Sequence, residues 1–225
     1  MMSAHTPSSI TIRSASPEDA GPAAALIYET ALTLGDYFFG QTGPEGTIRV
    51  LATLFPERDH LFSYQHTVLA VEGERIIGLM QALPADDMAR AGSALIRACW
   101  KCFGPWSTLR GIWRGWRLAF EPDAKPGEFY VDTLAVATAC RNRGVGAVLL
   151  RDAERQARER RLRVCSLSVM LHNVDALRFY QRQGYHEDLR YETKLRAPGV
   201  QYTGFHRMIK PVTGEELFPK DAAQS

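Results

Sequence analysis

The stretch over residues 130–147, YVDTLAVATACRNRGVGA, constrains the fold more than any other part of the chain. An apolar-rich strand is predicted over residues 129–136, followed by a turn and a helix that begins at Gly144 and Gly146. The first amides of such a helix have no partner within it, and they point outward with the positive end of the helix dipole. The stretch therefore predicts an anion-binding loop.

Two basic and two small residues strengthen this prediction. Arg141 and Arg143 add positive charge beside the turn. Gly144 and Gly146 would let an anion approach the backbone closely, because neither has a Cβ.

The elements that follow predict the topology. A helix over residues 145–160 has one apolar and one charged face, and an apolar strand over 163–170 comes after it. Strand, helix and strand in this order predict a parallel crossover. A further helix is expected from its N-cap Asn173 to Gln183, closed by Gly184.

The flanking segments supply further strands and helices. In chain order they are a strand over 10–13, a helix from the N-cap Ser16 to Leu34 that ends at Gly35, a loop over 36–46, a helix over 47–54, a hairpin of strands over 67–71 and 75–83, and strands over 185–195 and 202–211. We expect one domain over residues 1–225, with flexible tails over 1–9 and 213–225.

Residues 86–126 form a predicted helical insertion of different character. All four tryptophans lie here, in two amphipathic helices separated at Gly104 and Pro105. The main interpretation is a flap whose apolar face closes over the domain or pairs with a second copy, giving a homodimer. Basic residues stand between the tryptophans, so a membrane surface or another anionic partner, bound through residues 86–120, is the alternative.

Composition and short motifs narrow the function classes. The net charge of +2 and the lack of a basic module give no sign of nucleic-acid binding. No signal peptide and no uninterrupted apolar run of about 18 residues are seen, so we expect a cytoplasmic protein. Cys99 and Cys102 form a lone CxxC without the further ligands of a zinc site, so we expect no metal.

Residues 129–187 resemble the acyl-CoA-binding half of the GNAT (general N-acetyltransferase) superfamily. The strand YVDTLAV is followed by RNRGVG at 141–146, which fits Arg/Gln-x-x-Gly-x-Gly/Ala, and then by the strand RVCSLSVM. Matching residues further on are Asn173, Ala176, Phe179, Tyr180, Gly184 and Tyr185. A dinucleotide-binding loop fits less well because Leu149 stands at its third glycine, and the Gly-Lys-Ser/Thr of a P-loop is absent.

The resemblance implies an α/β (α+β) GNAT fold. Its mixed central sheet would have about seven strands flanked by helices. The order of elements before residue 129 also matches, except that the helical insertion would lie between the third and fourth strands, where the family usually has none.

The resemblance also implies how the cofactor acetyl-CoA is bound. The backbone of Leu134, Ala135 and Val136 would pair with the pantetheine arm, and an amide near Val136 would serve the oxyanion. The pyrophosphate would be held by Arg141, Asn142, Arg143, Gly144, Val145, Gly146 and Ala147. Asn173 would hold the arm, while Tyr180, two helical turns later on the same face, would protonate the leaving sulfur.

The base that deprotonates the amine is expected at Asp132, on the central strand where the family often places an acid. By the two-residue period of a strand, Asp132 shares a face with Leu134. Its short side chain favours a water relay. Glu72, Glu128 and Asp36 are reserves.

Each of these residues has a purely structural alternative. Tyr180 could be a core aromatic, Asn173 only an N-cap, and Asp132 a structural hydrogen-bonding group or a substrate anchor. Arg141 and Arg143 could be solvated charges of the turn.

Two functions therefore compete, beside a surface-associated protein whose insertion docks on anionic lipid. The first is an N-acetyltransferase that moves an acetyl group from acetyl-CoA to an amine of a small molecule or peptide by direct transfer. The second is an idle acyl-CoA-binding or sensing module that acts through the Trp-rich insertion. The acceptor is expected between the loop over 36–46 and the insertion. Aromatic residues in both segments favour a partly apolar acceptor or a longer acyl chain: Tyr37, Phe38, Trp100 and Trp113.

Overall fold

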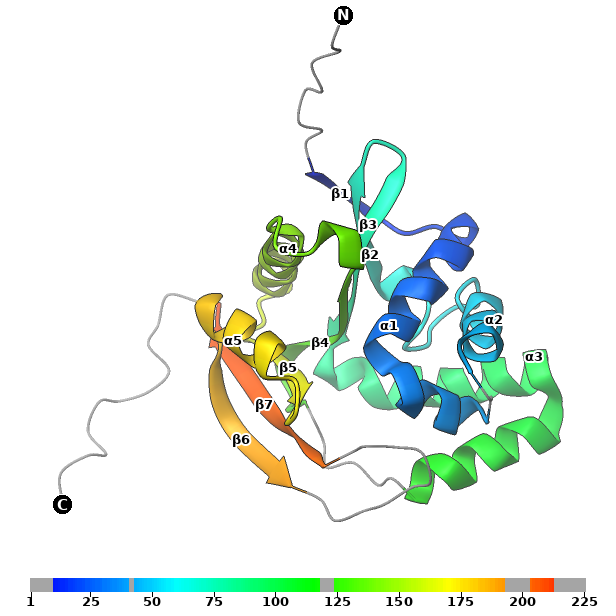
Figure 1. Ribbon diagram of the computed structural model, residues 1–225. Helices are drawn as coiled ribbons and strands as arrows, with labels where there is room; N and C mark the ends of the chain where they lie inside the picture. Colours follow the sequence, from blue (N-terminus) through cyan, green and yellow to red (C-terminus); the bar gives the residue numbers. More distant parts are fainter. Residues whose placement is uncertain (1–9, 41–42, 118–123, 193–202, 213–225) are drawn as a thin grey trace, which may run out of the picture.

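A seven-stranded sheet forms the centre of the computed structural model (Figure 1). The structure describes residues 10–40, 43–117, 124–192 and 203–212, without the side chains of 31–34 and 115–117. The strands are β1 (Ile10–Ser14), β2 (Thr67–Glu72), β3 (Arg75–Pro84), β4 (Glu128–Val136), β5 (Val164–Met170), β6 (His186–Glu192) and β7 (Gly204–Pro211), in the spatial order β1-β2-β3-β4-β5-β7-β6. β4 and β5 pair in parallel and the other neighbours are antiparallel, so the mixed sheet and the predicted crossover are confirmed.

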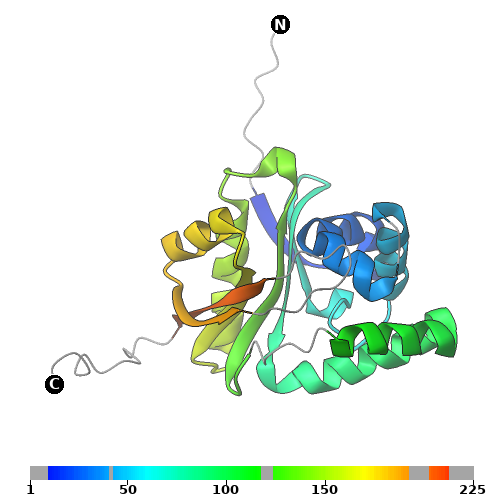
Figure 2. The same ribbon diagram turned by 60° about the horizontal axis from the view of Figure 1, so that its bottom comes forward.

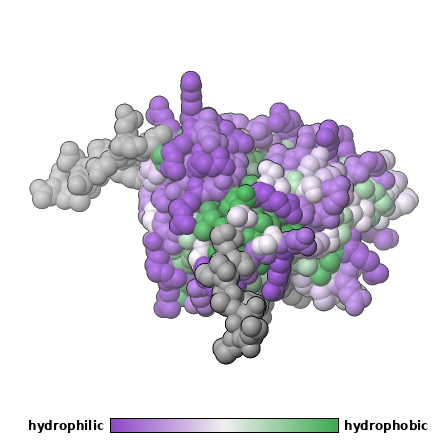
Figure 3. All heavy atoms as spheres, turned by 90° about the horizontal axis from the view of Figure 1, so that it is seen from above, coloured by the Kyte–Doolittle hydropathy of each residue, from purple (hydrophilic) through white to green (hydrophobic). Residues whose placement is uncertain are grey.

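Helices cover both faces of this sheet (Figure 1). The four covering helices are α1 (Ala20–Phe39) and α2 (Pro44–Leu54) on one face, and α4 (Val145–Glu159) and α5 (Val174–Arg182) on the other. Each pair of helices packs on an apolar cluster of the sheet. Ile27 and Leu51 belong to the cluster on the first face, and Leu149 and Ala153 to the cluster on the second. Seen from above, the surface is mostly hydrophilic around a central hydrophobic area (Figure 3).

The first helix is longer than predicted. α1 continues through Gly35 to Phe39 and ends at Gly40, whose φ of 65° is the left-handed conformation of a helix cap. The predicted loop over 36–46 is therefore wrong, because its described residues are almost all helical. α2 already begins at Pro44, a favoured first residue of a helix.

Two hydrogen bonds to Asp36 explain why Gly35 does not end the first helix. The carboxylate of Asp36 accepts a 3.2 Å hydrogen bond from the Tyr28 hydroxyl and a second hydrogen bond from the Thr47 hydroxyl of α2. Each such bond contributes about 1 kcal/mol. Together they offset the cost of about 1 kcal/mol for a glycine inside a helix.

The helical insertion between β3 and β4 is confirmed as α3 (Met88–Arg117). Gly104, with φ 76° and ψ 173°, interrupts α3 at the predicted break and divides it into a first arm before this residue and a second arm after it. The two arms lie at the periphery beside α1 and α2 (Figure 2). The guanidinium of Arg114 lies against Gly40, and Lys101 forms a 2.7 Å ion pair with Glu57, so α3 is fastened to this helical layer.

A buried arginine fastens the last two strands to β4. Arg207 on β7 is 1% exposed, and its guanidinium pairs with Glu128 on β4 and Asp188 on β6. The two late strands of the prediction correspond to β6 and β7. Residues 193–202, like both predicted tails, lie outside the described part of the chain.

Candidate active site

The two central strands separate near the middle of the sheet. β4 pairs with β5 only from Glu128 to Val131 in the described residues. β5 goes on pairing with β7 as far as Met170, whereas β4 beyond this point pairs with β3 alone. One edge of β4 over residues 132–136 is thus left without a partner strand in the described part of the chain. Such an edge can form hydrogen bonds with an extended ligand.

The direction of the β4 amides follows from one hydrogen bond. The amide of Ala137 donates to the Ile77 carbonyl of β3 at 3.0 Å. Backbone groups of successive strand residues alternate between the two edges, so the amides of Val136 and Leu134 point to the open edge. The amide of Ala135 points to β3. Of the three residues predicted to contact the pantetheine arm, two therefore present free amides.

The loop after β4 has the backbone that an anion-binding turn needs. Asn142 and Gly144 have left-handed φ values of 61° and 82°. A Cβ on Gly144 would meet no atom within 4 Å, so its conformation rather than its size explains the glycine. α4 begins directly after it at Val145, which places the unpaired first amides of this helix at the end of the open edge.

Gly146 owes its small size to helix packing. A Cβ at this position would lie 3.0 Å from Cζ of Phe179 on α5. The glycine thus lets α4 and α5 approach each other. This contact brings the loop over residues 141–147 close to the helix that carries Asn173 and Tyr180.

Arg141 and Arg143 are exposed, and each is paired with a carboxylate. Arg141 Nη2 lies 3.1 Å from Glu29 Oε2 of α1, and its Nε donates to the Val136 carbonyl at 3.2 Å. Arg143 pairs with Glu72 at the end of β2. Both guanidinium groups add to the positive potential at the start of α4, although the two carboxylates partly neutralise them.

Asn173 is the N-cap of α5. Its Oδ1 accepts a 3.2 Å hydrogen bond from the Ala176 amide. Its side-chain nitrogen makes no hydrogen bond to the described residues. The same residue can therefore cap the helix with its oxygen and donate to a ligand with its nitrogen.

Tyr180 is both a core aromatic and a free donor. It is 9% exposed, and its ring contacts those of Phe179 and Tyr185, with centroids 5.3 Å and 6.1 Å away. No described residue forms a hydrogen bond with its hydroxyl. Burial raises the pKa of Tyr180 to about 12, so the hydroxyl keeps its proton at neutral pH.

A β-bulge at Asp132 corrects one prediction. Val131 and Thr133 pair with adjacent residues of β3, so β4 has one extra residue between them. Val131 and Leu134, three positions apart, both pack in the apolar cluster under α4. Because the alternation is broken here, the prediction that Asp132 shares a face with Leu134 is wrong.

Asp132 has the electrostatic environment of a base. The residue is half-buried, and Oδ2 accepts a 3.1 Å hydrogen bond from the Thr133 hydroxyl. Burial raises the pKa of the carboxyl, and the Thr133 hydrogen bond opposes part of that rise. A carboxylate with a raised pKa beside a free strand edge can accept a proton from a bound amine.

The three reserve acids are engaged elsewhere. Glu128 lies in the buried pair with Arg207, and Glu72 is paired with Arg143, whose hydrogen bond lowers the pKa of Glu72. Asp36 accepts one hydrogen bond from Tyr28 within α1 and another from Thr47 of α2. Asp132, in contrast, has no cationic partner among the described residues.

Two residues with buried polar groups near the bulge were not among the predicted site residues. Gln81 on β3, opposite Thr133, donates to Thr67 at 3.0 Å, but its Oε1 has no partner in the described chain. Ser168 on β5, one residue past the last pair with β4, has an equally unpaired Oγ. A polar side chain within an apolar strand was the signal. Buried groups of this kind usually bind a ligand or water.

A profile of the Acetyltransferase (GNAT) family matches residues 35–185. The uncharacterised protein YxbD of Bacillus subtilis (strain 168) is 35% identical over 69 residues, which are 31% of this chain and 40% of that protein. The chain thus matches less than half the length of this curated relative.

Solved structures share the fold over most of the chain. A crystal structure of an acetyltransferase has a TM-score of 0.69 at 22% identity, and the match covers 90% of this chain and 100% of that one. An N-acetyltransferase from Staphylococcus aureus Mu50 has a TM-score of 0.69 at 19% identity, over 89% and 100% of the two chains. The ribosomal-protein-S18-alanine N-acetyltransferase from Escherichia coli has 0.53 at 15% identity, over 93% and 99%.

Proposed function

Because the chain belongs to the GNAT acetyltransferase family, we propose that it transfers an acetyl group from acetyl-CoA directly to an amine of a small molecule or peptide. The observation that carries the proposal is the open edge of β4 that leads into the N-terminus of α4. An unpaired strand edge suits an extended amide-containing arm, and helix amides with nearby arginines suit a pyrophosphate. Coenzyme A contains both.

The residues of the chain fit this cofactor. The amides of Leu134 and Val136 would bind the pantetheine arm, and the loop over 141–147 would bind the pyrophosphate. The side-chain nitrogen of Asn173 and the unpaired hydroxyl of Ser168 are further groups for the arm. When bound, acetyl-CoA supplies a thioester carbonyl that an amine can attack.

Asp132 is the proposed base. A free amine is needed, since an alkylammonium group has a pKa near 10. The raised pKa of Asp132 brings it closer to that of the amine than an exposed aspartate, which improves the match for proton transfer. The carboxylate would take the proton directly or through one water.

Val136 supplies the proposed oxyanion donor. Its amide points to the open edge of β4 and is fixed by the pairing of β4 with β3. A preorganised backbone donor of this kind stabilises the negative charge that develops on a carbonyl oxygen, typically by about 3 kcal/mol.

Tyr180 would stabilise the leaving sulfur. Its pKa of about 12 lies well above the value of about 8.5 of a simple thiol. Complete transfer of its proton to a thiolate would therefore be uphill by about 5 kcal/mol. We assign Tyr180 the donation of a hydrogen bond to the sulfur, with water as the final source of the proton.

A coenzyme A thiol-release screen tests the proposal. The wild-type protein would be incubated with acetyl-CoA and a panel of small amines, amino acids, polyamines and peptides with free N-termini. We expect thiol release with at least one acceptor, and a large loss in Asp132→Asn and Tyr180→Phe. Arg155→Ala, on the exposed face of α4, is the matched control. Tight binding of coenzyme A without thiol release across the panel would instead favour an idle binding module.

A further inference from the structure

The outer surface of α3 is the most apolar exposed helix surface in the described chain. Trp106, Leu109 and Trp113 of the second arm are 76%, 50% and 57% exposed. They stand at positions i, i+3 and i+7, so they form one stripe along the helix, which we call the α3 stripe. Ile96 and Trp100 of the first arm are 45% and 54% exposed. Large apolar side chains that gather in this way mark an interaction surface.

The charge of α3 is entirely positive. Its 30 residues include five arginines and one lysine but neither aspartate nor glutamate. The rest of the chain then has 21 basic and 25 acidic residues, against totals of 27 and 25. Arg97 and Arg110 are exposed and form no ion pair with the described residues. Positive charge is thus concentrated on the helix that carries the stripe.

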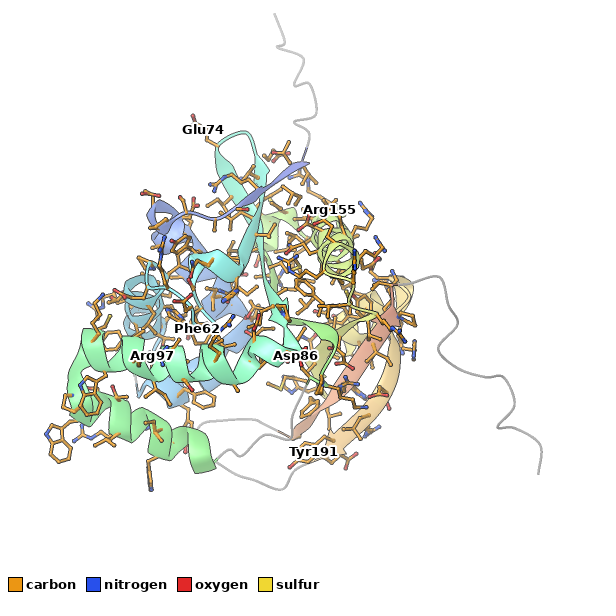
Figure 4. The ribbon with its side chains drawn as sticks, turned by 180° about the vertical axis from the view of Figure 1, so that it is seen from behind. Phe62, Glu74, Asp86, Arg97, Arg155 and Tyr191 are labelled. Atoms are coloured by element: carbon orange, nitrogen blue, oxygen red, sulfur yellow. The ribbon has the colours of Figure 1, made fainter. Side chains whose placement is uncertain are left out.

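The position of α3 leaves this surface accessible. The first arm packs inward through a face of small buried residues, which are Ala91, Ala94 and Ala98. In the second arm Thr108 is buried. Arg97 lies on the outer part of the molecule, and many side chains of both arms extend away from the sheet (Figure 4). Both arms thus have buried residues on their inner side, while Trp106 and Leu109 are largely exposed.

We propose that α3 binds the surface of an anionic phospholipid membrane. The α3 stripe would enter the boundary between headgroups and acyl chains, where indole rings are favoured. Arg97 and Arg110 would contact the phosphate groups. Within the described residues no helix meets the length and apolarity needed to cross a bilayer, so the contact would be superficial.

Charge favours a membrane over a second copy of the chain. A symmetric contact between two α3 helices would bring two all-basic surfaces together, with no acidic residue on either helix to compensate. Juxtaposed like charges oppose association. An anionic lipid surface instead attracts each exposed arginine, and each contributes about a fivefold increase in binding.

Vesicle sedimentation tests the proposal. The full-length protein would be mixed with vesicles of equal parts phosphatidylglycerol and phosphatidylcholine, and with vesicles of phosphatidylcholine alone. We expect sedimentation with the anionic vesicles only, with a shift of tryptophan emission to shorter wavelength. The double variant Arg97→Glu and Arg110→Glu should bind at least about 25-fold more weakly. The triple variant Trp106→Ala, Leu109→Ala and Trp113→Ala should bind at least about tenfold more weakly.

Matched controls separate α3 from general charge and apolarity. The double variant Arg151→Glu and Arg158→Glu changes two exposed arginines of α4, and Leu189→Ala changes an exposed apolar residue of β6. Both should sediment like the wild type. Thermal unfolding checks each variant, and Trp106→Ala alone replaces the triple variant if that unfolds.

Three results would overturn the proposal. The first is failure of the wild type to bind anionic vesicles, and the second is an equal loss of vesicle binding in the control variants. The third is a wild-type dimer that becomes monomeric in the stripe variant, without any binding of the wild type to vesicles. None of these depends on acetyl transfer.

Discussion

The hydroxyl of Thr133 donates a 3.1 Å hydrogen bond to the carboxylate of Asp132, its neighbour in β4. In a regular strand these two side chains would point to opposite faces. The bulge in the register with β3 brings them to one side. The same bulge lies where β4 leaves β5, just after Val131. The candidate base and the open strand edge are therefore adjacent because of one local irregularity.

Asp132→Asn is expected to stabilise the protein while it inactivates the enzyme. Burial raises the pKa of this carboxyl in the folded state above its ordinary 3.8, so ionisation destabilises the fold. That penalty is present above the folded pKa and disappears as the pH falls below 3.8. The variant should melt at a higher temperature than the wild type at neutral pH, with the difference shrinking toward acid pH, and kcat should fall about 100-fold.

Calorimetry across pH and steady-state kinetics on the variant check these two effects. A lower melting temperature at neutral pH would contradict the view that Asp132 is a desolvated, unpaired carboxylate. Unchanged turnover would remove it as the base.

Thr133→Val is expected to move the pH profile. The hydroxyl stabilises the ionised carboxylate and so lowers the pKa of Asp132. Its loss should raise that pKa, and the acidic limb of kcat/KM should shift to higher pH by about one unit or less. Thr133→Ser keeps the hydroxyl and serves as the control. An acidic limb that stays in place in Thr133→Val would show that another group titrates there.

Tyr180→Phe separates the hydroxyl from the ring. The hydroxyl has no hydrogen-bond partner among the described residues, so its removal should leave the melting temperature nearly unchanged. If it donates to the leaving sulfur, kcat should fall by about 100-fold while binding of coenzyme A changes little. Tyr185→Phe, whose ring lies 6.1 Å away, is the control and should retain full turnover. Equal activity of both variants would leave Tyr180 as a core aromatic only.

The sequence predicted the parts of the site that depend on local signals. The turn before α4, the break at Gly104 and the cap at Asn173 all follow from residues with special backbone or hydrogen-bonding preferences. The bulge at Asp132 could not be predicted, because it exists only relative to the residues of β3 that pair with β4. A period of two read along one strand cannot detect it.

Tertiary contacts account for the other errors. Gly35 has the local signature of a helix end, but hydrogen bonds from Tyr28 and Thr47 to Asp36 extend the helix to Phe39. The reason for Gly146 also lies outside its own segment, since Phe179 comes from a helix about thirty residues later in the chain.

Glu29→Gln and Glu72→Gln are expected to tighten the binding of coenzyme A. Glu29 pairs with Arg141 and Glu72 with Arg143, so each carboxylate partly neutralises an arginine of the proposed pyrophosphate site. Exposed ion pairs are weak, so removing one carboxylate should lower the Kd by about two- to fivefold. Titration calorimetry at low and high salt measures the Kd of coenzyme A, and the gain in affinity should shrink at high salt. Pantetheine, which has no pyrophosphate, should bind no more tightly to these variants than to the wild type. Tighter binding of pantetheine would contradict the assignment.

Arg207→Met is expected to destabilise the fold strongly. The guanidinium is 1% exposed and pairs with Glu128 and Asp188, and Lys125 lies 2.9 Å from Asp188. After the substitution Asp188 keeps its lysine, but Glu128 becomes a buried carboxylate without a cation. The loss should be about 3–5 kcal/mol in the free energy of unfolding, measured by urea denaturation.

Adding Glu128→Leu to Arg207→Met should recover most of this loss, because the uncompensated charge is then gone. Arg155→Met breaks two ion pairs of an exposed arginine on α4, with Asp152 and Glu159, and should cost much less than Arg207→Met. If the double variant were no more stable than Arg207→Met alone, the arginine would be stabilising β6 and β7 by packing rather than by neutralising Glu128.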